Sequence, residues 1–185
     1  EKIKLLRVFR INLPFEARSP FLRIINSFNL GFRTILRAIT SNYDVIIATS
    51  TPPILGPFFG AIAALISNSR FIYYCMDINP EVGLVSGDFT NRFFYKILES
   101  IDIWSSTKAE PLLVLSRDMR NTFLRRPYRK KPCIKIINNF SLEARSFDQK
   151  QDIYSKFKLS SNSLTIIYAG NVGRFQELQE VVKAM

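Results

Sequence analysis

The sequence predicts an α/β protein built on a Rossmann-like parallel sheet. Short runs of residues that are apolar throughout recur along the chain, and stretches of helical length separate them. Strands that are apolar on both faces are typical of a parallel sheet whose two faces are covered. A strand–helix repeat of this kind folds with right-handed crossovers. We expect strands at residues 45–49, 70–76 and 111–115, and a weaker one at 133–137.

The segments between these strands have the length and composition of helices. Residues 54–67 separate the first pair of strands, residues 89–100 the second and residues 117–124 the third. Ser116 is placed to cap the N-terminus of the last helix. Together these elements predict a β-α-β-α-β unit.

A further helix is expected before the first strand, at residues 20–40. Leucine, isoleucine and phenylalanine recur on one side of it, whereas Arg23, Arg33 and Arg37 lie elsewhere. Gly31 marks a position at which this helix could bend or end.

Residues 45–69 contain no charged side chain. An uncharged run of this length is one that a hydropathy window would identify as a membrane-spanning helix. Pro52, Pro53 and Pro57 interrupt this stretch. The helix that remains has at most 14 residues, whereas a bilayer requires about 20. We therefore favour a strand, a turn and a helix over a membrane span, and peripheral attachment stays open.

The ends of the sequence predict a segment of a longer protein. It begins at Glu1 without an initiator methionine, and it stops at Met185 in what should be the first turns of a helix. Residues 1–140 would form most of a first domain. Residues 141–163 are polar and would be a linker or domain edge. Residues 164–185 would begin a second domain with a strand at 164–169 and a helix from Arg174.

Composition excludes several chemistries. The chain has no histidine, so these residues cannot supply an imidazole base, a Ser-His-Asp triad or a histidine metal ligand. Cys75 and Cys133 lie too far apart for a zinc knuckle, and two cysteines make no disulfide framework, so a reducing cytoplasm fits best. The net charge of +11 predicts an anionic partner, which could be nucleic acid, acidic lipid or a phosphorylated substrate.

Gly170-Asn171-Val172-Gly173, between the predicted strand and helix, is a candidate phosphate site. Glycines allow close backbone approach, a helix N-terminus favours an anion, and Arg174 adds a cation. The alternative is a tight turn without a ligand. The GxGxxG pattern of dinucleotide-binding proteins is absent.

Asp77 and Glu81 follow the predicted strand at 70–76. Ligands of open parallel sheets bind outside the carboxyl ends of the strands, so both carboxylates should lie near a cleft. There they could bind sugar hydroxyls or accept a proton. The alternative is a capping aspartate and an exposed glutamate, which is the favoured interpretation for Glu81.

A basic run occupies residues 117–135. Most such runs are solvated surface, but Phe123, Leu124 and Tyr128 lie among the charges, as on a surface that meets anionic head groups. Its basic members are Arg117, Arg120, Arg125, Arg126, Arg129, Lys130, Lys131 and Lys135.

Five motifs, in this order and spacing, resemble those of family 4 glycosyltransferases of the GT-B fold. The similarity is strongest to the bacterial enzymes that build O-antigen and capsular polysaccharide on a lipid carrier. It covers the chain from about Tyr43 onward. The motifs are YDVIIATSTPP (43–53), DINPE (77–81) with Gly87 after it, VLSRDM (114–119), IINNF (136–140) and YAGNVG (168–173).

The resemblance implies retaining transfer of a hexosyl or acetamido sugar from a nucleotide-sugar, with no metal or other cofactor, in a cleft between two Rossmann-like domains. The acceptor would be a lipid-linked glycan, so the enzyme would work as a peripheral protein at the cytoplasmic face of the cell membrane. Asp77 would face the reacting sugars, Glu81 the acceptor, and Gly170, Asn171, Gly173 and Arg174 the donor diphosphate. The segment alone should be inactive, because further donor-site residues of the family would lie beyond Met185.

Two other classes compete with this expectation. A nucleic-acid-binding module would explain the basic run, but no nucleic-acid-binding motif supports it, and we expect no nucleic-acid partner. Another Rossmann-like nucleotide-binding enzyme, such as a dehydrogenase or an epimerase, would share the fold. The missing GxGxxG pattern disfavours that second class.

Overall fold

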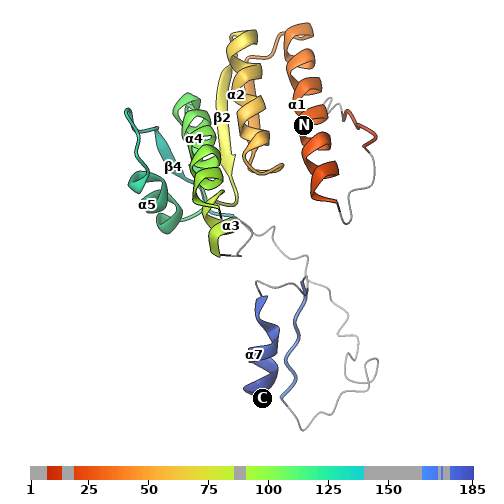
Figure 1. The fold of residues 1–185 in the computed structure, drawn as a ribbon, viewed down its shortest axis with the longest axis vertical. Helices are drawn as coiled ribbons and strands as arrows, with labels where there is room; N and C mark the ends of the chain where they lie inside the picture. The colour runs from red at the N-terminus through yellow and green to blue at the C-terminus, as the bar shows by residue number, and fades with distance from the viewer. Residues whose placement is uncertain (1–7, 14–18, 86–90, 140–163, 171, 173–175) are drawn as a thin grey trace, which may run out of the picture. The chain divides into compact units, whose positions relative to one another are not determined.

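The computed structural model describes most of the chain, and the described residues fall into two compact units (Figure 1). One unit comprises Glu1–Asn138 and the other Asn139–Met185. The described residues are 8–13, 19–85, 91–139, 164–170, 172 and 176–185.

The first unit is an α/β structure on a four-stranded sheet in which all strands are parallel. Its strands lie in the order β1 (Val45–Thr49), β2 (Arg70–Cys75), β3 (Leu112–Val114) and β4 (Ile134–Ile136). The predicted Rossmann-like α/β class is therefore confirmed. The strands lie within the ranges predicted for them, because runs of β-branched and apolar residues mark buried strands locally.

Helices precede and connect these strands. They are α1 (Pro20–Thr40), α2 (Leu55–Ser67), α3 (Glu81–Val85), α4 (Arg92–Lys108) and α5 (Arg117–Arg125). The predicted cap of α5 is confirmed, since Ser116 Oγ accepts a hydrogen bond from the Met119 backbone N–H at 3.2 Å.

The expected helix at 89–100 is wrong at both ends. Asn91 caps α4 by accepting from the Phe93 N–H at 2.9 Å, and the helix continues to Lys108. In its second half the buried Ser105 and Ser106 hydroxyls donate to backbone carbonyls within the helix, at 2.9 and 2.8 Å, so neither is buried without a hydrogen-bond partner.

The hydrophobic core lies on one face of the sheet. In order β1-β2-β3-β4, every right-handed crossover steps in the same direction, so the connecting helices fall on one side. Figure 1 shows α2 and α4 in front of β2. The core residues are Ala61, Ala64, Phe71, Tyr73, Cys75, Ala109, Leu112, Val114 and Phe123.

The opposite face of β1 is not covered by the described residues. Ile47 is 63% exposed, and Val45 beside it on this face is also exposed. The expectation of a sheet covered on both faces is wrong for β1 in the described part of the chain. Val45 and Ile47 are residues typical of a covered face, but no described residue covers them.

Helix α1 continues through Gly31 without a break and packs against α2. A Cβ atom at Gly31 would overlap the ring of Phe59, so the glycine permits close approach of the two helices and does not end α1. Among the described residues, no helix combines the length and apolar character that a bilayer crossing requires.

The second unit contains helix α7 (Leu178–Lys183). The strand expected at residues 164–169 is absent, because no described residue supplies the hydrogen-bonded neighbour that a strand needs. The helix expected from Arg174 begins only at Leu178 among the described residues, and Arg174 itself lies outside them.

Candidate functional site

The carboxyl ends of the parallel strands define the candidate site. Because β1 and β2 run in the same direction, the segments that follow them lie at one edge of the sheet. Ser50 follows β1, whereas Asp77 and Glu81 follow β2.

Ser50 fixes the start of the segment after β2. Its side chain is buried, and its Oγ accepts hydrogen bonds from the backbone N–H groups of Met76 and Asp77, both at 3.1 Å. The Cys75 thiol donates to the Asp77 carbonyl oxygen at 3.2 Å. The backbone of Asp77 is therefore held by Ser50, which follows the neighbouring strand β1, and by Cys75 at the end of β2 itself.

The Asp77 carboxylate itself is directed to solvent. Its residue is exposed, and none of the described side chains hydrogen-bonds or ion-pairs with it. An ionised carboxylate is an acceptor that can bind sugar hydroxyls or take a proton. A fixed backbone whose carboxylate binds no described side chain is the arrangement expected of a group that meets a substrate.

Glu81 has a different environment, because Arg126 binds both of its carboxylate oxygens. Arg126 Nε donates to Oε1 at 2.7 Å and Nη2 donates to Oε2 at 2.6 Å. The Glu81 side chain is 24% exposed, whereas that of Arg126 is buried. This bidentate pair ties the N-terminus of α3 to the end of α5.

Arg126 also joins two other parts of the first unit. Its Nη1 donates to Asp102 Oδ2 at 2.5 Å, and its Nη2 donates to the backbone oxygen of Asn79 at 2.8 Å. The hydroxyl of Tyr73 donates to the other Asp102 oxygen at 2.9 Å. We call Tyr73, Glu81, Asp102 and Arg126 the Arg126 cluster.

Burial and charge act against each other in the Arg126 cluster. Burial raises the pKa of Asp102, and the Arg126 charge and hydrogen bond counteract this rise. Burial alone would lower the pKa of Arg126, but the hydrogen bonds to Glu81 and the Asp102 charge raise it above its ordinary value. Burial raises the pKa of Tyr73 well above its usual range, so its hydroxyl remains a donor to Asp102.

The sequence patterns do not reveal this cluster. Arg126 belongs to the basic run expected at the surface, but its side chain is buried, with two carboxylates around it. The remaining signal was Asp102, a single acid between Ile101 and Ile103 in an amphipathic helix. An acid at such a position requires a partner, but the sequence does not say which.

Most of the basic run is nevertheless surface. Arg117, Arg120, Arg125, Lys130 and Lys131 are exposed, as are Arg129 and Lys135. Tyr128 is half-buried, and its hydroxyl shares a hydrogen bond of 2.9 Å with Ser106.

The predicted phosphate turn lies largely outside the described residues. Gly170 is exposed, and a Cβ atom there would lie 2.9 Å from the Tyr168 hydroxyl. Asn171, Gly173 and Arg174 are not among the described residues.

The described residues contain no cluster of three or more acidic or cysteine side chains that could hold a metal ion. Comparisons with protein-family models, with curated proteins and with solved structures each returned no match.

Proposed function

We propose that this chain is part of a retaining glycosyltransferase of the GT-B type, which moves a sugar from a nucleotide-sugar to a lipid-linked or polysaccharide acceptor in cell-surface glycan synthesis. The observation that supports this most directly is the placement of Asp77. Its exposed carboxylate follows a parallel strand, on a backbone that Ser50 and Cys75 hold. Substrates of open α/β sheets bind at such positions.

In this proposal Asp77 contacts the reacting sugars, and its carboxylate binds a hydroxyl or accepts the acceptor's proton. The Glu81 carboxylate already binds Arg126 with both oxygens. We therefore assign Glu81 to holding the segment that includes Asp77, on the acceptor side of the site.

Gly170, Asn171, Gly173 and Arg174 supply the donor side. A glycine-rich turn leaves room for a diphosphate near backbone N–H groups, and an arginine adds charge-assisted hydrogen bonds. The proposal requires no metal or other cofactor for this contact.

Calorimetry with uridine diphosphate on the full-length protein tests the donor side. Arg174→Gln should weaken binding about ten- to a hundredfold, the effect of losing a hydrogen bond to a charged group. Gly173→Val should weaken it too, because a side chain would occupy the space of the phosphate. Lys183→Gln is the control, since Lys183 is exposed and pairs with Glu180 at 2.7 Å. Unchanged affinity in both turn variants would contradict the assignment.

We also propose peripheral attachment to an anionic membrane, where a lipid-linked acceptor would be found. The exposed residues of the basic run should attract acidic lipid by about 1 kcal/mol each near the surface, and salt should screen this attraction. The combined variant Arg125→Gln, Lys130→Gln and Lys131→Gln should reduce binding to anionic vesicles without weakening nucleotide binding. Arg126 is excluded from this set because it is buried. Vesicle binding that responds neither to salt nor to these substitutions would leave the run as solvated surface.

A further inference from the structure

Helix α1 presents an exposed apolar stripe. Its members recur every three or four residues, so they lie on one side of the helix. Phe21 is 69% exposed and Phe32 is 60% exposed. A row of exposed, large apolar side chains along one helix indicates an interaction site. The stripe comprises Phe21, Ile24, Ile25, Phe28, Phe32, Leu36 and Ile39.

The charged residues of α1 are all basic. The helix contains Arg23, Arg33 and Arg37 and no aspartate or glutamate. A helix with exposed apolar residues on one side and arginines on the other resembles helices that lie in the interface of an anionic membrane. The charge therefore favours a negatively charged partner over a neutral apolar one.

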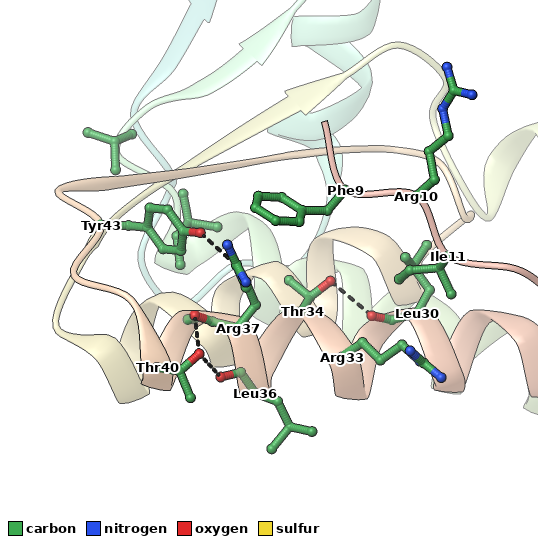
Figure 2. Close-up of a pocket in the computed structure, with 13 residues that line it drawn as sticks. Phe9, Arg10, Ile11, Leu30, Arg33, Thr34, Leu36, Arg37, Thr40 and Tyr43 are labelled. Carbon is green, nitrogen blue, oxygen red and sulfur yellow. Dashed lines mark hydrogen bonds between the residues drawn. The ribbon is translucent and has the colours of Figure 1, made fainter. Parts of the chain in front are cut away.

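A groove of about 660 Å³ lies beside the stripe, between α1, the segment 8–13 and the start of β1 (Figure 2). Leu36 belongs to both the stripe and the groove. The lining includes three arginines and no acidic residue. Its apolar members are Phe9, Ile11, Leu30, Leu36, Ala38, Val45 and Ile46.

Arg37 provides a cation that is already oriented in this groove. Its Nε donates to the Tyr43 hydroxyl at 3.2 Å, and its guanidinium carbon lies 3.8 Å from the centre of the Phe9 ring. Figure 2 shows the side chain between these two residues. No described residue accepts from its two terminal nitrogens, so both can bind an anion. The same hydrogen bond lowers the pKa of Tyr43.

We infer that α1 and this groove bind an anionic phospholipid of the membrane, with the phosphate on the terminal nitrogens of Arg37 and the apolar stripe among the acyl chains. A guanidinium binds a phosphate in bidentate geometry. A soluble phosphate would leave the stripe and the apolar lining exposed, whereas a lipid covers them. The inference rests on the proposed peripheral attachment and not on sugar transfer.

The first test separates a phosphate site from general charge attraction. In flotation assays with the full-length protein, Arg37→Lys should weaken binding to vesicles containing phosphatidylglycerol about fivefold, because lysine keeps the charge but loses the bidentate contact. Arg23→Lys is the matched control, since Arg23 is exposed on the same helix but does not line the groove. It should bind as the unmodified protein does.

The second test concerns the stripe. Phe21→Ser and Phe32→Ser should each weaken vesicle binding about tenfold. Each variant lacks a phenylalanine ring that would move from water into the acyl chains on binding. Phe93→Ser is the matched control, since Phe93 on α4 is 73% exposed and outside the stripe. It should leave binding unchanged.

Four results would overturn the inference. Equal vesicle binding by Arg37→Lys and Arg23→Lys would mean that only general charge attraction holds the protein on the vesicles. Displacement of the protein from vesicles by millimolar glycerol phosphate would indicate a soluble ligand. Self-association that the stripe substitutions abolish, without vesicle binding, would identify an interface between copies of the chain. If the unmodified protein does not bind anionic vesicles, the proposal of peripheral attachment is wrong as well. Uridine diphosphate calorimetry tests the transferase proposal separately.

Discussion

Arg126 is the side chain whose loss this fold should tolerate least. It neutralises the buried Asp102 carboxylate while binding Glu81 and the Asn79 carbonyl oxygen. A buried ion pair adds little stability compared with apolar residues of the same shape, but removal of one partner leaves an uncompensated buried charge.

We therefore predict that Arg126→Gln lowers the free energy of unfolding by about 3–5 kcal/mol, measured by urea denaturation. The control is the neighbouring exposed residue Arg125. Arg125→Gln should change the free energy of unfolding by less than about 0.5 kcal/mol. Equal stability of the two variants would show that Arg126 is not buried among carboxylates.

The two cysteines should differ sharply in reactivity. Burial raises the pKa of the Cys75 thiol to about 12, and the residue is in the core, whereas Cys133 is exposed. Because the thiolate is the reactive form, iodoacetamide at pH 8 should label only Cys133 in the folded chain and both thiols in urea. Labelling of Cys75 at the rate of Cys133 without denaturant would contradict the packing of β2.

The pH dependence of stability follows from the same pKa shift. The unfolded Cys75 thiol ionises near pH 8.5, so above that pH the unfolded state loses a proton that the folded state keeps. Stability should therefore decline as the pH rises from about 8.5 toward 12. Cys75→Ala should lessen this decline in urea denaturation series, and an identical decline in both proteins would assign it to other groups, such as Tyr73.

At the scale of secondary-structure elements, β1 and β3 should respond differently to truncation. Leu112 is fully buried between the sheet and its helices, so Leu112→Ala should cost about 2–5 kcal/mol of unfolding free energy. Ile47 is largely exposed, so Ile47→Ala should cost less than about 1 kcal/mol in this chain. Comparable losses would mean that the open face of β1 is covered.

This contrast shows which features the sequence could predict. Strand positions, the extent of α1 and the Ser116 cap depend on neighbouring residues, so local patterns identified them. The exposure of Ile47 depends on what lies over the sheet, which an apolar run does not encode. The Arg126 cluster was also missed, because its ion pairs join residues 24 and 45 positions apart.

In the molecule as a whole, the proposed function depends on one asymmetry of the sheet. Asp77 lies at the carboxyl edge, where substrates of parallel α/β sheets bind, whereas Asp44 precedes β1 at the amino edge. Both residues are exposed acids, so substitution of either should leave the fold intact. The two substitutions should differ in their effect on sugar transfer.

The most direct test compares Asp77→Asn with Asp44→Asn in the full-length protein, by release of nucleoside diphosphate from a panel of nucleotide-sugars with lipid-linked acceptor present. We predict that Asp77→Asn lowers the rate at least a hundredfold and retains the affinity for uridine diphosphate, since loss of a catalytic acid–base group lowers rates by about 10²–10⁴. Asp44→Asn should keep full activity. Full activity of Asp77→Asn, or no sugar transfer by the unmodified protein from any donor in the panel, would contradict the account.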